Sequence, residues 1–134
     1  MRLAIVLAAV SLQAAQSGGI TLSDVAGTWK VRSMVGPKDS VVAQSVTVAT
    51  ADPKGWIMRL EARPPIPMRI VTVGGDSIVT EAGPYPSILR KGLTVTVLRN
   101  VTHYKGDTMT GTFEAHYSSG DVFRGKTEGR RMFH

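Results

Sequence analysis

Residues 108–130, TMTGTFEAHYSSGDVFRGKTEGR, carry the pattern of a β-hairpin. Two runs rich in Thr, Phe and Val flank Ser118-Ser119-Gly120, and glycine supplies the positive φ that a three-residue hairpin loop needs. This loop sets apolar residues opposite each other on one face and opposite charges on the other: Ala115 with Phe123, Phe113 with Gly125, and Glu114 with Arg124. The stretch therefore predicts an antiparallel hairpin whose inner face carries Phe113 and Phe123.

Runs of the same kind recur along the chain, each bounded by glycine, proline or other turn residues. The expected strands are 28–35, 41–50, 56–61, 68–73, 77–82, 87–89, 93–103, 108–117 and 122–130. Leu22–Ala26 is predicted to form one short helical turn, which Thr21 or Ser23 could cap. The connections are too short for crossover helices, so neighbouring strands should pair antiparallel. Because closure removes the bare edges of a long meander, we predict an all-β fold, a single antiparallel up-and-down β-barrel of about eight to nine strands. A two-sheet sandwich is the competing arrangement.

The strand expected at 93–103 has no clear inner face. One alternating set is Leu93, Val95, Val97, Arg99 and Val101, and the other is Thr94, Thr96, Leu98 and Asn100. A bulge that shifts the alternation midway would reconcile the two. The direction of Arg99 bears on function, because burying an arginine without an internal carboxylate costs free energy unless the guanidinium meets a ligand anion.

Residues 1–17 show, in order, the charged, apolar and small-residue regions of a secretory signal peptide. The apolar run Leu3–Val10 is too short to cross a bilayer core of roughly 30 Å. Cleavage is expected before Gly18, with a cut after Ala15 as the alternative. We therefore expect a periplasmic or secreted protein with no membrane span, in which residues 18–134 form one barrel domain.

The composition argues against several kinds of site. The sequence has no cysteine, so it can form neither a disulfide nor a thiolate metal site. Its 16 Lys and Arg against 10 Asp and Glu give a formal net charge of +6, but no basic stripe with interleaved aromatic residues indicates nucleic-acid binding. His103 and His116 lie near opposite ends of the expected hairpin, so no metal and no cofactor is predicted. No nucleophile elbow, carboxylate pair or phosphate loop indicates catalysis.

The segment Val25-Ala26-Gly27-Thr28-Trp29-Lys30-Val31 follows the expected helical turn and opens the first strand. A Gly-x-Trp at this point, Gly27 to Trp29, resembles the first motif of lipocalins and related calycin barrels. In that family the tryptophan closes the narrow end of the barrel beneath an arginine of the last strand. The resemblance therefore implies a lipocalin-like barrel in which Arg130 or Arg131 stacks on Trp29.

Two proline-rich stretches, Arg63–Pro67 and Gly83–Pro86, should lie at one mouth of the barrel as stiff rims, because proline donates no ladder hydrogen bond. If that end is open, rim and inner-face residues would contact a ligand: Trp56, Met58, Ile66, Tyr85, Arg99, Phe113 and Phe123. The alternative is that the stretches are rigid connectors and that Ile66 and Tyr85 plug the end, since side chains often fill eight-stranded barrels.

Export, a barrel and the lack of a catalytic set favour a binding protein for a small apolar or amphipathic ligand. The alternative is a protein-interaction module with a filled barrel, which predicts an exposed apolar or basic patch. A barrel enzyme of the isomerase or cyclase kind comes third, and it requires a buried His, Arg or Glu that points into a pocket. The volume and polarity of the interior separate the three.

Overall fold

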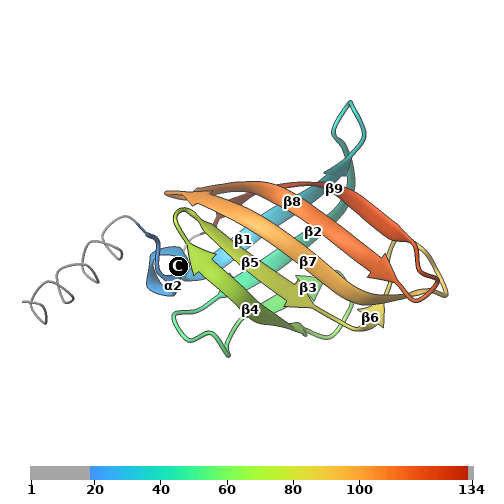
Figure 1. The fold of residues 1–134 in the computed structure, drawn as a ribbon, viewed down its shortest axis with the longest axis horizontal. Coiled ribbons are helices and arrows are strands. Elements are labelled where there is room, and N and C mark those ends of the chain that lie inside the picture. Colours follow the sequence, from blue (N-terminus) through green and yellow to red (C-terminus); the bar gives the residue numbers. More distant parts are fainter. Residues whose placement is uncertain (1–18, 133–134) are drawn as a thin grey trace, which may run out of the picture.

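The computed structural model describes residues 19–132, which form nine strands and one helical turn in a single barrel (Figure 1). The expected signal peptide, residues 1–17, lies outside the described residues. The elements are α2 (Leu22–Val25), β1 (Gly27–Val35), β2 (Ser40–Ala49), β3 (Ile57–Leu60), β4 (Ile66–Gly74), β5 (Ser77–Ala82), β6 (Tyr85–Pro86), β7 (Thr94–Lys105), β8 (Thr108–Tyr117) and β9 (Val122–Arg131). No helix within residues 19–132 is long and apolar enough to cross a membrane.

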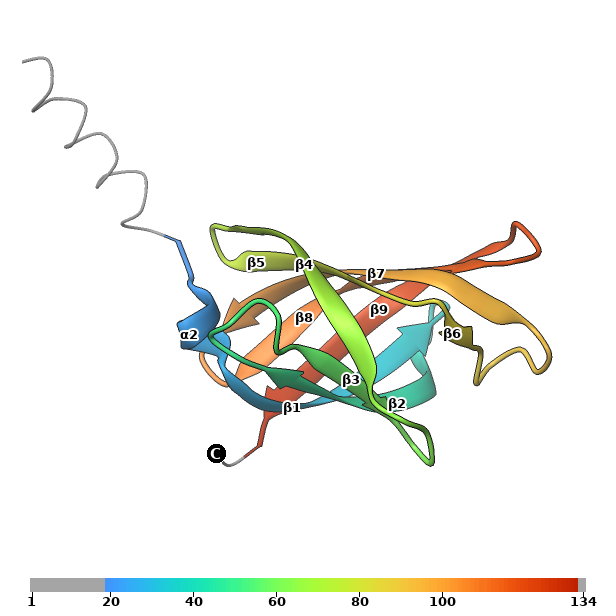
Figure 2. The same cartoon turned by 90° about the horizontal axis from the view of Figure 1, so that it is seen from below.

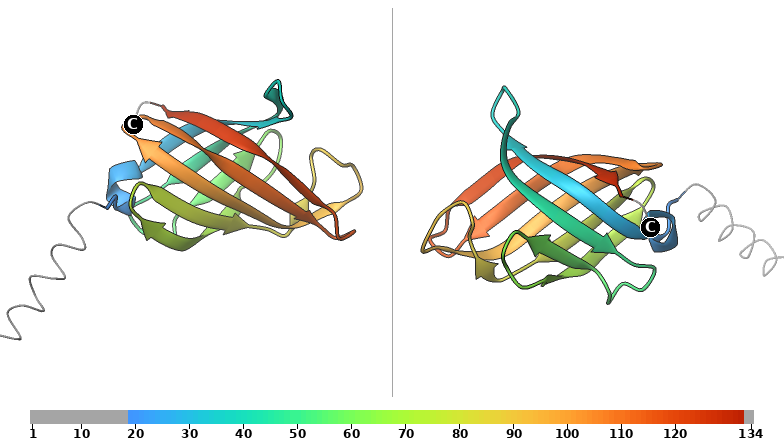
Figure 3. Two further views of the ribbon diagram at one scale, coloured as in Figure 1. Left: turned by 45° about the horizontal axis from the view of Figure 1, so that its top comes forward. Right: turned by 180° about the vertical axis from the view of Figure 1, so that it is seen from behind.

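The sheet closes on itself through two pairings that join distant parts of the chain. β1 pairs with β9 as well as with β2, and β5 pairs with β7 as well as with β4. All pairings are antiparallel, and β6 is a short extra strand that pairs with the first two residues of β7. Figure 2 shows the strands wrapping around one interior, and Figure 3 shows β1 and β2 completing the wall behind it. The prediction of a single antiparallel barrel is confirmed, and the sandwich is excluded.

β5 and β6 act as one strand with an interruption. Both pair with β7, β5 along Leu98–His103 and β6 along Thr94–Val95. Between them Gly83 has a φ of 114°, and a side chain there would collide with the carbonyl oxygen of Thr96. The expectation of a strand at Ser87–Leu89 is wrong, because the Ser87 hydroxyl accepts hydrogen bonds from the backbone amides of Leu89 and Arg90 and holds this segment in a bend.

β7 carries the bulge that its sequence suggested. The register with β8 shifts between Val95 and Val97, so Val95 and Leu98 both face the interior. Beyond the bulge the inward set continues through Asn100 and Thr102. Arg99 therefore faces outward, where its Nη1 donates to Glu81 Oε2 at 3.0 Å, so the inward arginine considered from the sequence does not exist.

The hairpin of β8 and β9 has the expected register. Ala115 pairs with Phe123, Glu114 with Arg124, and Phe113 with Gly125. Gly120 in its loop has a φ of 94°. A side chain at Gly125 would overlap the Phe113 ring and the carbonyl oxygen of Met34 on β1, so the missing side chain makes room for the phenylalanine.

Trp29 and the helical turn seal one end of the barrel. Thr21 caps α2 with a capping box that includes Asp24. The Trp29 side chain is fully buried, and its Nε1 donates to the Val25 carbonyl oxygen at 2.8 Å. Its ring meets Tyr104 edge-on, with centroids 5.0 Å apart.

The arginine over this tryptophan is Arg131 and not Arg130. The Arg131 guanidinium carbon lies 4.9 Å from the Trp29 ring centre, whereas Arg130 is exposed. Gly27 opens β1 with a φ of 141°, opposite Ala49. The sealed end thus combines the start of β1, the end of β9 and α2.

Candidate functional site in the barrel interior

The interior holds two small cavities that share the side chains of Ser45, Met58 and Leu98. The cavity nearer the sealed end, here called the floor cavity, has a volume of about 40 Å³. The cavity nearer the other end, the mouth cavity, has a volume of about 60 Å³. Both are far below the roughly 300–1,000 Å³ of a site for a drug-sized ligand, so side chains fill most of the barrel.

The floor cavity is lined by apolar side chains together with uncharged polar ones. Its hydroxyl and amide side chains come from β2, β5, β7 and β9: Ser45, Thr47, Thr80, Asn100, Thr102 and Thr127. Tyr104 also lines it, and burial raises the pKa of the Tyr104 phenol well above its usual value. The floor cavity can therefore donate and accept hydrogen bonds but cannot neutralise an ion.

The mouth cavity is mainly apolar. Its aliphatic and aromatic lining includes Leu60, Val95, Phe113 and Ala115. Hydroxyl side chains interrupt this lining, and two of them, Ser87 Oγ and Tyr117 Oη, lie 3.2 Å apart and share a hydrogen bond. Tyr85 stands beside them, and burial, followed by the nearby Tyr117, raises the pKa of Tyr85 to about 12.

One loop covers the mouth cavity. Residues 87–93, here called the mouth loop, place the Ile88 and Leu89 side chains in the cavity wall while each stays 40% exposed. Large apolar side chains that are half in the wall and half in water have few partners to hold them. Ser87, Ile88 and Leu89 of this loop are the lining residues of the mouth cavity that belong to no strand.

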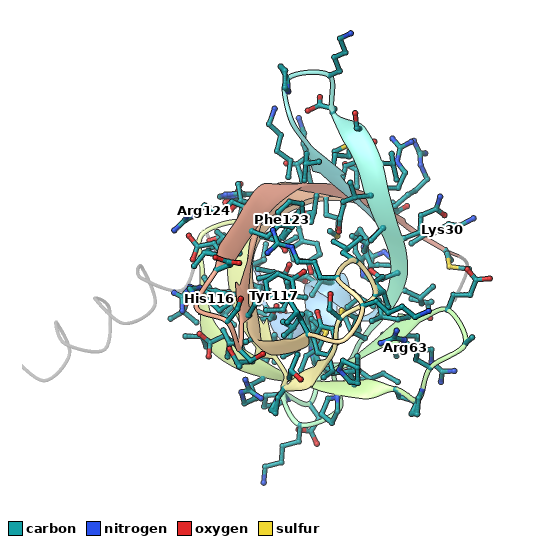
Figure 4. The ribbon with its side chains drawn as sticks, turned by 90° about the vertical axis from the view of Figure 1, so that its right-hand side faces the viewer. Lys30, Arg63, His116, Tyr117, Phe123 and Arg124 are labelled. Carbon is teal, nitrogen blue, oxygen red and sulfur yellow. The ribbon has the colours of Figure 1, made fainter. Side chains whose placement is uncertain are left out.

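Two arginines fasten the mouth loop to neighbouring turns. The Arg63 guanidinium, from the β3–β4 turn, donates to the carbonyl oxygens of Pro86 and Ser87. The Arg90 guanidinium pairs with Asp121 at 3.2 Å and lies over the rings of Tyr117 and Phe123, at 4.8 and 5.6 Å from their centres. Figure 4 looks into this end and shows Tyr117 and Phe123 near its centre and Arg63 at the rim.

A groove on the outer surface, of about 740 Å³, begins where the mouth cavity ends. Ala43 and Ile88 line both spaces, so the Ile88 side chain stands between cavity and groove. The groove continues along β2 and the β3–β4 turn, where Val41, Glu61 and Arg63 line it. A displaced mouth loop would join the groove to the interior.

The residues proposed as ligand contacts fall into three groups. Met58, Tyr85 and Phe113 line the mouth cavity, and Met58 reaches the floor cavity as well. Ile66 is buried and the Phe123 ring centre lies 5.9 Å from that of Phe113, but neither residue lines the floor cavity or the mouth cavity.

The other two candidates do not lie at the mouth. Trp56 lines the floor cavity, with its Nε1 donating to the Thr50 carbonyl oxygen at 2.8 Å. It precedes β3 whereas Arg63 follows it, and a strand advances about 3.3 Å per residue, so the two lie at opposite ends of the barrel. Arg99 is outside, so the observation that suggested a barrel enzyme is lost.

Sequence reasoning missed the mouth loop and the hydroxyl groups of the floor cavity. The alternation of apolar and polar residues does not predict that Ser87 and Ile88 contact the cavity, because a loop has no fixed side-chain period. Tyr117 did have one: it follows Phe113 and Ala115 at steps of two, which places it on the same inner face.

The titratable groups of the described residues lie outside these cavities, the tyrosines apart. His103 contacts Asp76 at 3.0 Å and His116 contacts Glu114 at 3.2 Å, and both pairs are exposed to solvent. Within residues 19–132 no group of three His, Asp or Glu side chains could hold a metal ion. What the interior offers is shape and hydrogen bonding.

The fold and the interior define a closed antiparallel barrel with an uncharged, two-part cavity beneath one loop. No family model, curated protein or solved structure matches this chain.

Proposed function

We propose that this protein is an exported binding protein that takes a small apolar or amphipathic ligand through the mouth of the barrel. One observation carries the proposal: a single loop closes the apolar mouth cavity, and Ile88 of that loop also faces a large groove outside. The stacking of Arg131 on Trp29 supports the resemblance to lipocalins. The apolar N-terminal run of the sequence supports export.

Binding requires the mouth loop to move. A cavity of about 150 Å³ is large enough for benzene, and the two interior cavities together are smaller than that. Displacing Ile88 and Leu89 from the wall enlarges the space and opens it toward the groove. The ligand then replaces the apolar contacts that these two side chains give up.

The contacts that hold the mouth loop are weak enough for this. Arg90 and Asp121 are a solvent-exposed pair, and such pairs contribute about 0–1 kcal/mol. The stacking of Arg90 and the hydrogen bond between Ser87 and Tyr117 add about 1 kcal/mol each. If the Arg63 hydrogen bonds to Pro86 and Ser87 stay in place, moving Ile88 and Leu89 out of the wall thus costs a few kcal/mol. A conformation of that free energy is populated at about 0.1–10%.

Calorimetric titration with 1-hexanol tests the proposal. We expect saturable binding by the wild type and weaker binding by Ala115→Val, because the two added methyl groups occupy the mouth cavity. Thr112→Val, at an exposed position of the same strand, is the matched control and should bind like the wild type. Absence of saturable binding by the wild type would refute the proposal.

The small cavities also favour a second function, a protein-interaction module with a filled barrel. The exposed apolar side chains of Val41, Ile88 and Leu89 lie around the groove and the mouth loop, where a partner would find them. This function needs no loop movement. Under it the wild type gives no saturable 1-hexanol binding, whereas the first function requires it.

A further inference from the structure

We infer that the ligand carries an uncharged hydrogen-bonding headgroup, which lies in the floor cavity while the apolar part fills the mouth cavity. This inference rests on the proposed function, because it states which amphipathic molecules the barrel accepts and in which direction they enter. The headgroup class is a small alcohol, primary amide or carbonyl compound.

Polarity changes along the barrel axis. Toward the sealed end hydroxyl and amide side chains, among them Thr80, Asn100 and Thr127, interrupt a lining that is otherwise apolar. Toward the mouth it is dominated by hydrocarbon, among it Leu60 and Phe113. An amphipathic molecule buries its apolar part and keeps its hydrogen bonds only if its headgroup goes in first.

The interior excludes ions. None of the described residues that line either cavity carries a charge at neutral pH. On the strands concerned, the alternation turns charged side chains outward, as with Arg99 on β7 and Lys126 on β9. An ionised carboxylate or ammonium in the floor cavity would lose its hydration without gaining a counter-charge, which is costly.

One buried hydroxyl is left without a partner. Thr127 Oγ1 is inaccessible to solvent and finds no hydrogen-bond partner among residues 19–132, and Thr127 as a whole is 5% exposed. Native proteins rarely leave a buried polar atom unpaired, and this threonine lines the floor cavity. A headgroup in that cavity supplies the missing partner.

The size of the floor cavity limits the headgroup. About 40 Å³ is only slightly more than the share of liquid volume of one water molecule, about 30 Å³, so the cavity holds only a small headgroup. Met58 and Leu98 stand between the two cavities, and the flexible Met58 side chain can shift to make them continuous. A ligand of this shape has a compact head and an unbranched apolar tail.

A series of six-carbon compounds with different headgroups tests the inference by calorimetric titration at pH 7. The series is 1-hexanol, hexanamide, hexanoate and hexylammonium. We expect the alcohol and the amide to bind at least about tenfold more tightly than the two ions, because an unpaired buried charge costs far more than the 1.4 kcal/mol of a tenfold change.

Thr127→Val separates the headgroup site from the tail site. It keeps the shape of the side chain and removes the hydroxyl, so we expect about fivefold weaker 1-hexanol binding, the worth of one hydrogen bond. Asn100→Leu should have a similar effect, and it provides a second variant should Thr127→Val fold poorly. Thr110→Val, at an exposed position of β8, is the control and should change nothing.

The outcomes distinguish this inference from the proposed function. If hexanoate binds as well as 1-hexanol and neither interior variant weakens binding, the headgroup lies at the mouth near Arg63 and the inference is wrong, while the binding function stands. If no compound of the series binds, the proposed function fails and the inference fails with it.

Discussion

Trp29 and Arg131 are direct cross-strand partners in the ladder that joins β1 to β9, and the guanidinium of Arg131 lies over the Trp29 ring. The same guanidinium donates to the carbonyl oxygens of Asp24, Ala26 and Gly106. Its Nε lies 2.8 Å from the Asp107 carboxylate. One side chain thus ties together α2, the start of β1, the β7–β8 turn and the end of the last strand.

Removing this guanidinium should weaken the sealed end. For Arg131→Ala we expect a loss of about 2–4 kcal/mol in the free energy of unfolding, because a stacking interaction and several charge-assisted hydrogen bonds go together. Arg131→Lys keeps the charge but cannot make the forked contacts, so it should recover only part of the loss. Chemical denaturation measures both, with the exposed Arg130→Ala as the control. Equal stabilities of the two alanine variants would contradict this role.

Gly125 makes room for the Phe113 ring and for the β1 backbone. We expect Gly125→Ala to destabilise the protein by about 2 kcal/mol or more, as overpacking of a filled core does. Gly74→Ala is the control, since a side chain there meets no atom within 4 Å and the backbone is not in the left-handed region. Combining Gly125→Ala with Phe113→Leu should recover part of the loss in thermal unfolding. Additive losses would show that the collision with Phe113 is not the cause.

Glu114 links the stability of the β8–β9 hairpin to pH. Hydrogen bonds from Arg124 and then from His116 lower the pKa of the Glu114 carboxyl below its usual value of 4.5. A carboxyl whose pKa is lower in the folded state stabilises the fold fully above its ordinary pKa, and this stabilisation is lost as the pH falls through the lowered value. In Arg124→Gln the Glu114 pKa should move back toward 4.5, which an NMR titration of the side-chain carboxyl measures. An unchanged pKa would show that Arg124 is not its main cause.

The mouth loop should open more readily when Arg90 is removed. The amides of Leu89 and Arg90 donate to Ser87 Oγ, so their hydrogen exchange reports on the integrity of the loop. For Arg90→Ala we expect about fivefold faster exchange at position 89, corresponding to the loss of about 1 kcal/mol from the stacking and ion-pair contacts. Lys91→Ala is the control. Equal exchange in the two variants would show that Arg90 does not hold the loop.

The inward and outward faces of a strand could be predicted from the sequence wherever apolar and polar residues alternate along it without interruption. The β8–β9 hairpin satisfied both the apolar and the charged pairing at once, so its register followed from the residues alone. The inner face of β7 could not be predicted from its sequence. Its bulge near Thr96 lies against the break at Gly83 on the neighbouring strand, and the bulge is recognised only when the two strands are paired. A bulge is a property of two paired strands, and a single alternating sequence does not locate it.

The candidate site was less predictable than the fold for a related reason. Phe113 was found because inward positions of strands recur every second residue. The mouth loop depends on Ser87 acting as a hydrogen-bond acceptor and on two arginines from distant turns, which no local pattern reveals. The sequence prediction placed Trp56 at the mouth because Trp56 is close to the proline-rich turn along the chain, and this was wrongly taken to mean that the two are close in space.

Methyl NMR during a titration with 1-hexanol shows whether the ligand enters the barrel, because the shifted methyl signals locate it. We expect the methyl signals of Met58 and Leu98, inside the barrel, to shift together with those of Ile88 and Leu89 in the mouth loop. Val71 and Val73, exposed on β4, should not respond. Shifts confined to Val41 and Val42 in the outer groove, with the interior methyl groups unchanged, would contradict entry into the barrel.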